Sequence, residues 1–304
     1  MTKTLVIILA ETREYELTFD NIKKNLIDEL NADLCLCIGV KDDYNYNNPF
    51  YKFAKHKFLY KEPTNYLSAF QFAENIINPN LKINWHKFMQ LKDQFLGGVL
   101  VDPSIDHLGS DGILIFYRWF LLHKLNETNL INQYDRFIIT RSDYIYLLPH
   151  PKMEILNENN IWIPNGEHYG GLTDRHVVLN KTFLEPYLNI LNCFILKNDE
   201  YFNKMKKYEQ WNLERLIGFH LYNNNNLKNV KFFPYIMYTV RSRNGTTRWS
   251  KGVYDEKHKY FIKYITEYEQ ANLFKKKFEE NKKDIDLFYY HEMLNQIFSS
   301  KIIF

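Results

Sequence analysis

Cysteine, glycine and proline are scarce in this sequence, and none of its apolar runs is long. The chain of 304 residues contains 3 cysteines, 11 glycines and 9 prolines. An odd cysteine count without regular spacing excludes a disulfide framework, so Cys35, Cys37 and Cys193 favour a reducing, cytoplasmic compartment. The apolar run at 4–10 is too short for a bilayer and lacks a signal-peptide cleavage pattern. We therefore expect no membrane span.

Charge of a single sign is also in short supply. The formal net charge is +3, from 39 basic and 36 acidic residues that are spread along the chain. Nucleic-acid-binding proteins concentrate positive charge on one face, so this balance gives no support for nucleic acid as a partner. The hydrophobic content of 45% is that of an ordinary globular protein, and the length allows one large domain or two small ones.

Several catalytic and nucleotide-binding motifs are missing. The sequence has neither a Gly-x-Gly-x-x-Gly fingerprint nor a Walker-type phosphate loop, which argues against most nucleotide-dependent hydrolases. It also lacks a Gly-x-Ser-x-Gly elbow, a His-Glu-x-x-His motif and the cysteine and histidine spacing of a zinc site. The histidines are scattered, and we expect His150, His176 and His220 to be structural.

The pattern that is present belongs to the α/β class. "TLVIILA" at 4–10 predicts a buried strand, and "ADLCLCIGV" at 32–40 predicts a second one. Between them, Phe19, Ile22 and Leu26 recur at helical spacing. A strand, a helix and a strand within 40 residues predict a βαβ unit in a central, mostly parallel sheet that helices flank on both faces.

The rest of the chain continues this alternation. We expect a loop at 41–65, helices at 66–77, 83–98, 109–127, 183–197 and 209–222, strands at 136–143, 160–166 and 229–245, a strand or a helix entry at 176–181, and a helical tail from about 255 to 304. Ser110 or Asp111 is expected to cap the helix at 109–127.

Arg141, Ser142 and Asp143 follow the apolar strand "RFIIT", where neither an arginine nor an aspartate helps to fill a core. Ligands of open α/β sheets bind outside the carboxyl ends of the strands. A carboxylate with an arginine two residues before it suits a divalent cation and a phosphate group. The alternative is an aspartate that caps a turn and pairs with Arg141, because Arg-x-Asp is a weak motif.

A second polar segment lies between the apolar stretches at 160–166 and 176–181. Gly170 and Gly171 allow close approach of the backbone to a ligand, and Asp174 and Arg175 follow them. Because unpaired polar side chains are costly in a core, one interpretation is a loop that presents them to a polar ligand. The other is a double-glycine turn with a local pair of Asp174 and Arg175.

Two more segments carry arginines. Thr12 and Arg13 directly follow the first strand, so the same site can include them; a surface arginine that opens a helix is the alternative. Arg241, Arg243 and Arg248 surround an Asn-Gly pair. Such a loop can close over a diphosphate and stabilise a leaving group, or it can be an exposed basic hairpin.

Four of these segments together resemble GT-A-type glycosyltransferases of large DNA viruses, including chloroviruses and mimivirus-like giant viruses. They are "ETREYELTFDNIKKNL", "NADLCLCIG", "YDRFIITRSDYIY" and "IPNGEHYGGLTDRHVVLN", with "TRSD" and "YGGLTDRH" the most specific parts. The resemblance implies a Rossmann-like, nucleotide-sugar-binding catalytic domain at 1–250. Residues 251–304 would form a helical extension packed on this domain. A viral enzyme of this kind would work in the host cytoplasm.

The resemblance also raises the question of a metal. Such enzymes usually carry an Asp-x-Asp motif that holds Mn²⁺ or Mg²⁺ against the diphosphate of the donor. The matching position here reads Arg141-Ser142-Asp143, so only the last carboxylate is present. Either Asp143 is the metal ligand, with phosphate and water completing the coordination, or Arg141 replaces part of the charge of the metal.

The implied reaction transfers a sugar from a nucleotide diphosphate sugar, such as UDP-glucose or UDP-rhamnose, to a hydroxyl of a glycan, protein or small-molecule acceptor. Thr12 and Arg13 would line the nucleotide end. The arginines at 241–248 would stabilise the leaving diphosphate together with the metal.

The resemblance leaves the catalytic roles open. Asp174 and Arg175 would bind the sugar or face the acceptor. An inverting enzyme needs a general base, for which Asp174 is the first candidate and Glu214 the second, whereas a retaining enzyme needs none. The alternative function is a nucleotide-sugar or carbohydrate-binding protein that kept the fold and lost turnover, which the incomplete Asp-x-Asp motif favours.

Overall fold

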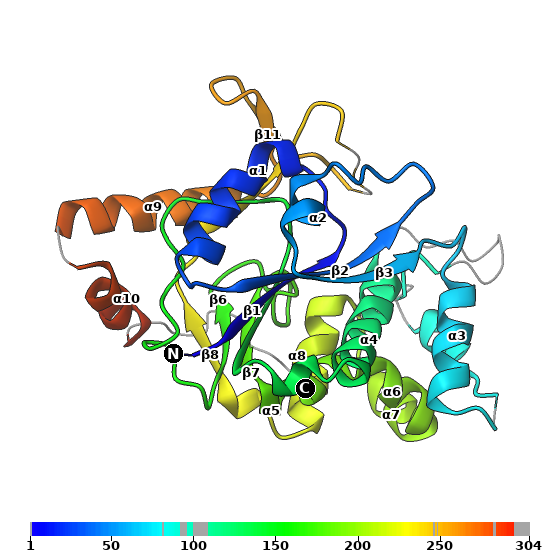
Figure 1. Ribbon diagram of the computed structural model, residues 1–304. Helices are drawn as coiled ribbons and strands as arrows, with labels where there is room; N and C mark the ends of the chain where they lie inside the picture. Colours follow the sequence, from blue (N-terminus) through cyan, green and yellow to red (C-terminus); the bar gives the residue numbers. More distant parts are fainter. Residues whose placement is uncertain are drawn as a thin grey trace.

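A seven-stranded sheet runs through the centre of the protein (Figure 1). The computed structural model describes residues 2–80, 82–91, 96–99, 109–245, 247, 249–281 and 284–294. The order of the strands is β3-β2-β1-β4-β7-β6-β8. Their bounds are β1 (Thr4–Ala10), β2 (Asp33–Val40), β3 (His56–Lys61), β4 (Arg136–Thr140), β6 (Ile161–Pro164), β7 (Val177–Asn180) and β8 (Val230–Phe233).

Most of these strands run in one direction. β1 pairs in parallel with β2 and β4, β2 with β3, and β6 with β8, whereas β7 is antiparallel to both β4 and β6. All residues of β1 are buried, which explains its continuous apolar sequence. The predicted α/β class with a central, mostly parallel sheet is confirmed.

Helices cover both faces of the sheet (Figure 1). One face carries α3 (Leu67–Ile77), α4 (Asp111–Glu127), α5 (Lys181–Leu188), α6 (Ile190–Leu196), α7 (Asn198–Met205) and α8 (Leu213–Asn223), and the other carries α1 (Tyr15–Ile22) and α2 (Pro49–Phe53). Leu5, Ile7 and Leu9 of β1 belong to the first core, and Val6 and Ile8 belong to the second. Side chains of a strand alternate between its faces, so β1 supplies both cores.

A small antiparallel sheet lies beside the carboxyl end of β4. It contains β5 (Tyr144–Tyr146), β9 (Met237–Arg241), β10 (Val253–Asp255) and β11 (Tyr260–Ile262), in the order β10-β11-β9-β5. The expected helices of the C-terminal part are present as α9 (Ile265–Asn281) and α10 (Ile285–Leu294). They follow the hairpin of β10 and β11, so the expectation of a purely helical tail was wrong at its start.

The interval between β2 and α3 differs from the prediction. Residues 41–65 are not a loop throughout, because they contain α2 and β3. β3 lies at the edge of the sheet, and its sequence "HKFLYK" is half polar because only one of its residues is fully buried. Continuous apolar character therefore cannot reveal such a strand.

Two helix predictions also need correction. The helix expected at 83–98 is a 3-10 helix at Trp85–Gln90, and residues 92–95 lie outside the described part. Ser110 precedes α4 as expected, but its side chain makes no capping hydrogen bond to the described residues. For residues 176–181 we expected a strand or a helix entry. Residues 177–180 form a strand, β7, and α5 begins directly after it. Within the described ranges, no helix has both the length and the apolarity to span a membrane.

Candidate functional site

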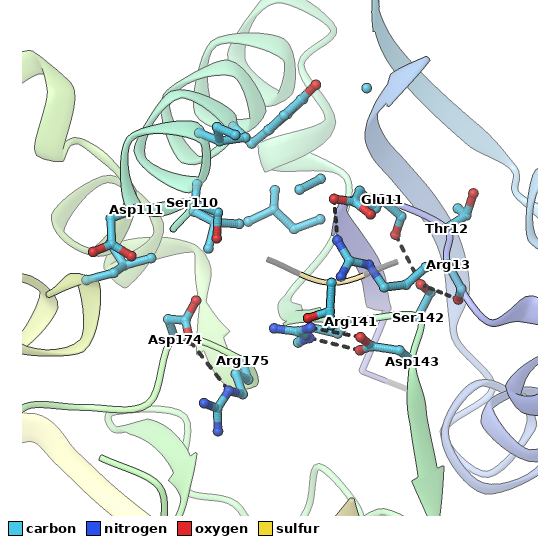
Figure 2. A pocket seen from close by; sticks show the side chains of 18 of the residues that line it. Glu11, Thr12, Arg13, Ser110, Asp111, Arg141, Ser142, Asp143, Asp174 and Arg175 are labelled. Atoms are coloured by element: carbon cyan, nitrogen blue, oxygen red, sulfur yellow. Dashed lines mark hydrogen bonds and ion pairs between the residues drawn. The ribbon is translucent and has the colours of Figure 1, made fainter. Parts of the chain in front are cut away.

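The chain reverses its direction of travel across the sheet at β1. From β1 it continues to β2 and β3 on one side, and it later enters β4 on the other side of β1. Strands that diverge in this way leave a crevice at their carboxyl ends, where open α/β sheets bind ligands. The segments that follow the two strands, Glu11-Thr12-Arg13 and Arg141-Ser142-Asp143, both reach this crevice (Figure 2).

A cavity of about 780 Å³ occupies the crevice. Its volume lies in the range of small-molecule sites. The lining comes from the carboxyl ends of β1, β2 and β4, the first turns of α4 and α8, the loop before β7 and the segment after β11. The residues predicted from the sequence that line it are Thr12, Arg13, Arg141, Ser142, Asp143, Asp174, Arg175 and Glu214.

Ser142 joins the two loops at the mouth of this cavity. Its buried hydroxyl lies 3.1 Å from the carbonyl oxygen of Glu11 and 3.0 Å from that of Arg13. The carbonyl oxygen of Ser142 in turn accepts a hydrogen bond of 2.6 Å from the hydroxyl of Thr18 on α1. Ser142 therefore fixes the position of Arg13 relative to Arg141, which a ligand that contacts both side chains requires.

The backbone is strained at two positions of the lining. Ala10, the last residue of β1, has a φ of 72°, and Tyr169 has a φ of 45°. The left-handed conformation costs a residue other than glycine about 1–2 kcal/mol, and such residues concentrate at functional sites. Beyond Ala10, Thr12 is held by the hydroxyl of Tyr44 at 2.8 Å and by the amide nitrogen of Asn48 at 2.9 Å.

One side of the cavity is cationic. Nε and Nη2 of Arg141 each donate to a carboxylate oxygen of Asp143 at 2.8 Å, and the buried Arg241 donates to the same carboxylate. Lys263 and Arg13 line the cavity beside them. Burial and the charges of the three arginines lower the pKa of Lys263 to about 7. So much positive charge in one place favours an anionic ligand. We call Arg13, Arg141, Arg241 and Lys263 the cationic cluster.

The carboxylate of Asp143 does not fit a divalent metal ion in this arrangement. Both of its oxygens accept hydrogen bonds from guanidinium groups, and its side chain is only 1% exposed. Burial alone would raise its pKa, but Arg141 and Arg241 hold the pKa well below the usual range. A cation bound there would face the cationic cluster. Across the described residues, no three histidine, cysteine, aspartate or glutamate side chains gather as a metal site.

The opposite side of the cavity is acidic (Figure 2). Asp111 opens α4, Asp174 lies in the loop before β7, and Glu214 lies in the first turn of α8. Burial and the negative charge of Asp174 raise the pKa of Asp111 to about 7 and that of Glu214 to about 8. At neutral pH, Glu214 therefore keeps its proton and can donate a hydrogen bond. We call these three residues the acidic group.

Arg175 lines the cavity with its charge already paired. Its Nη1 donates to Oε1 of the fully buried Glu267 at 2.9 Å, and its guanidinium lies 4.0 Å from the ring centre of Tyr264. Glu267 also accepts hydrogen bonds from Tyr235 and from Thr239 of β9. Arg175 thus ties the loop that carries Asp174 to α9 and β9.

Of the predicted residues that the structure describes, four do not line the cavity. A Cβ on Gly171 would overlap the backbone of Glu214, so this glycine permits close contact between the loop and α8. Gly170, with a φ of 82°, faces open space. Nε of Arg243 donates to the hydroxyl of a tyrosine of β10 at 2.9 Å. Arg241 reaches the site through Asp143 alone, and Arg248 lies outside the described residues.

Within the cationic cluster and the acidic group, two residues were not predicted from the sequence. Lys263 was not singled out, because a lysine after a short hairpin strand gives no local signal. Asp111 was interpreted only as a helix cap, and its position near Asp174 depends on the packing of α4 against the loop before β7.

The chain was compared with known proteins. No protein-family model and no curated protein matches it. Among solved structures, it is similar to mouse xyloside xylosyltransferase 1 in the apo form, with 9% identity and a TM-score of 0.35, over 76% of this chain and 85% of that chain. It is also similar to core-mannan synthase A from Aspergillus fumigatus in the Mn/GDP form, with 10% identity and a TM-score of 0.41, over 83% and 80% of the two chains. Similarity of this degree assigns no function.

Proposed function

We propose that this protein is a glycosyltransferase of GT-A type that moves a sugar from a nucleoside diphosphate sugar to an acceptor hydroxyl. The carrying observation is that Arg13, Arg141 and Lys263 of the cationic cluster and the three residues of the acidic group line one cavity at the point where the strand order reverses. A nucleoside diphosphate sugar has an anionic diphosphate next to a sugar rich in hydroxyl groups, so its two parts match the two sides. The segments "TRSD" and "YGGLTDRH", which carry the resemblance to glycosyltransferases, contribute to both sides.

The charges suggest how the donor lies. Arg141, Lys263 and Arg13 of the cationic cluster line the cavity, and they contact the diphosphate. Thr12 lines the nucleoside end, where β1 and β2 finish. Glu214 and Asp111 hold hydroxyl groups of the sugar or the acceptor, because a carboxyl group accepts hydrogen bonds and, when it is protonated, also donates one.

Asp174 is our candidate for the general base. The acceptor oxygen forms a bond to the anomeric carbon while Asp174 takes the proton of the acceptor hydroxyl. The bond between the anomeric carbon and the diphosphate oxygen breaks, and the leaving diphosphate keeps the electron pair. The cationic cluster stabilises the charge that grows on this oxygen. A single displacement of this kind inverts the configuration of the sugar.

The donor is proposed to be a uridine diphosphate sugar, such as UDP-glucose or UDP-rhamnose, and the acceptor a glycan, a protein or a small molecule. Cys35, Cys37 and Cys193 are all buried free thiols, which supports the proposal of a reducing, cytoplasmic compartment.

A panel of nucleotide sugars tests the function. The purified protein is incubated with UDP-, GDP-, ADP- and TDP-linked sugars and a mixed acceptor set, and released nucleoside diphosphate is measured alongside thermal shifts. We expect at least one nucleoside diphosphate to raise the melting temperature, since a ligand at 100 times its Kd adds about 2.7 kcal/mol of stability. The matching donor should release its nucleotide faster with acceptor than without. Stabilisation without turnover would favour the non-catalytic alternative, and no stabilisation by any nucleotide would refute both.

A further inference from the structure

The clearest departure from a metal-assisted transferase is the way in which Asp143 is used. Its carboxylate is the acceptor for two guanidinium groups, Arg141 from its own loop and Arg241 from β9. Arg141 is bound through both Nε and Nη2, a bidentate geometry that leaves its remaining nitrogen, Nη1, for another acceptor. The side chain of Arg141 is 25% exposed and lines the cavity, whereas Asp143 is 1% exposed.

Positive charge exceeds negative charge around this pair. The carboxylates that pair or hydrogen-bond beside the cationic cluster are Asp143, Glu11, which pairs with Arg13, and Glu14, which accepts a hydrogen bond of 2.9 Å from the backbone amide of Ser242. Asp43 and Glu62 also line the cavity, after the ends of β2 and β3. Arg241 is fully buried, and its Nε and Nη2 find no acceptor within the described part of the chain. Buried positive charge that is not fully compensated is costly, so an anion in the adjoining cavity stabilises the cluster through its charge, although Arg241 itself does not line the cavity.

Lys263 lies in the same excess of positive charge and comes from a third segment of the chain. It follows β11, its ammonium donates to the hydroxyl of Thr247 at 2.6 Å, and it lines the cavity. Burial and then the charges of Arg241, Arg141 and Arg13 lower its pKa. An anion that binds between Lys263 and Arg141 would restore the ordinary preference of the lysine for its charged form.

We propose that the cationic cluster binds the donor diphosphate directly, without a divalent metal, and that Asp143 is a positioning residue that orients Arg141 instead of a metal ligand. This inference rests on the proposed function and deepens it. Arg141, Lys263 and Arg13 donate hydrogen bonds to the phosphate oxygens. When the bond to the anomeric carbon breaks, these side chains stabilise the diphosphate, and no proton transfer to the leaving group is needed.

Calorimetric titration with inorganic pyrophosphate and with UDP tests the proposal on the full chain. Each ligand is titrated in EDTA and again in saturating Mn²⁺, at one fixed ionic strength. We expect the two affinities for each ligand to agree within about threefold. Arg141→Ala and Lys263→Met should each weaken binding in EDTA by about tenfold to a hundredfold, because each removes hydrogen bonds from a charged donor. Lys204→Ala, on the exposed surface of α7, is the matched control and should leave both affinities unchanged.

A double-mutant cycle separates positioning from metal binding at Asp143. If Asp143 acts through Arg141, then Asp143→Asn weakens binding in EDTA, and the double variant binds no more weakly than Arg141→Ala alone. A metal ligand at Asp143 predicts the opposite: Asp143→Asn leaves binding in EDTA unchanged and removes only the gain from Mn²⁺. Because Asp143 is buried, Arg141→Lys provides a second measurement; it keeps the charge but loses the bidentate contact, and it should show part of the loss of Arg141→Ala.

The outcomes distinguish this inference from the proposed function. Binding of pyrophosphate and UDP in EDTA, weakened by the two variants, supports both. Binding that requires Mn²⁺ overturns the inference and leaves the function in place. Binding of pyrophosphate in EDTA without any nucleotide or nucleotide sugar supports the anion site and overturns the function, and no binding of either ligand overturns both.

Discussion

Ser142 and Asp143 illustrate how polar residues at the end of a buried strand are kept in place by partners. Ser142 reaches two carbonyl oxygens of the loop after β1, and Asp143 accepts hydrogen bonds from two arginines. Both side chains have hydrogen-bond partners, so their burial does not leave an unpaired polar group that would destabilise the fold. The sequence allowed two interpretations of Arg141, a local ion pair and a ligand contact. The two are compatible, because the pair with Asp143 orients an arginine that still lines the cavity.

Asp174→Asn is expected to separate chemistry from donor binding. Asparagine cannot accept the proton of the acceptor, so nucleotide release with acceptor should fall by about 10²–10⁴. The backbone carbonyl of Asp174 accepts a hydrogen bond of 3.1 Å from Arg118, which the substitution keeps, so donor affinity should change little. Steady-state rates and calorimetric titration measure the two quantities. Asp199→Asn, at an exposed position on α7, serves as the control, and an unchanged rate in Asp174→Asn would remove Asp174 as the base.

Glu214→Gln is expected to stabilise the protein more at pH 8 than at pH 5. Burial and the charge of Asp174 raise the pKa of Glu214 from about 4.5 to about 8, so between these values the folded state binds a proton that the unfolded state has lost. The contribution of Glu214 to the free energy of unfolding is fully present below pH 4.5 and is lost as the pH rises toward 8. Glutamine does not titrate and removes that loss.

Melting temperatures of the wild type and Glu214→Gln between pH 5 and pH 8 check this expectation. The difference between the two proteins should grow with pH. Glu279→Gln, whose side chain is exposed on α9, is the matched control and should show a constant difference. A constant difference for Glu214→Gln as well would mean that the carboxyl group is not perturbed in the folded state.

The loop before β7 and the first turn of α8 act as one unit in shaping the acidic group. The amide of Leu172 donates to the carbonyl oxygen of Glu214 at 2.9 Å, and the amide of Gly171 donates to the carbonyl oxygen of His168 at 2.8 Å. The sequence indicated that Gly170 and Gly171 allow a close approach, and the structure assigns the approach at Gly171 to α8. Asp174 is brought near Glu214 by this contact between two elements.

The two adjacent glycines therefore respond differently to alanine. In Gly171→Ala the new methyl group overlaps the backbone of Glu214, so the loop must move, and overpacking of this kind costs about 1–3 kcal/mol in addition to backbone effects. In Gly170→Ala the new methyl group meets open space, so the unfolding free energy falls only because of the left-handed φ of 82°, by about 1 kcal/mol. Urea unfolding measures both. Equal losses of unfolding free energy in the two variants would contradict the assigned contact.

How much of this architecture was predictable depends on whether the signal is local. Buried strands such as β1, β2 and β4 have continuous apolar sequences, and α4 has a long helical pattern, so these elements were predicted. The edge strand β3 is half polar, and β10 and β11 have only 3 residues each, so these strands were not predicted. Among site residues, those directly after buried strands were predicted, whereas Lys263 and Asp111 reach the cavity only through packing between distant segments.

Truncation after residue 250 tests whether the C-terminal segment is a separate extension or part of the domain. Removing residues 251–304 takes away β11, which pairs with β9, together with Lys263 of the cationic cluster. It also removes Glu267, the buried hydrogen-bonded partner of Arg175, and breaking a buried ion pair by removing one partner costs about 3–5 kcal/mol. Against a total stability of about 5–15 kcal/mol, we expect this chain not to unfold cooperatively.

A chain that ends at residue 281 is the matched control for this truncation. It retains the hairpin, Lys263 and all of α9, and it loses α10, so it should still unfold cooperatively and bind pyrophosphate. Circular dichroism in a urea series and calorimetric titration compare the two chains with the full protein. Cooperative unfolding of residues 1–250 with unchanged pyrophosphate affinity would show that the domain ends near 250. It would also show that the anion site does not need Lys263, because the truncated chain lacks it.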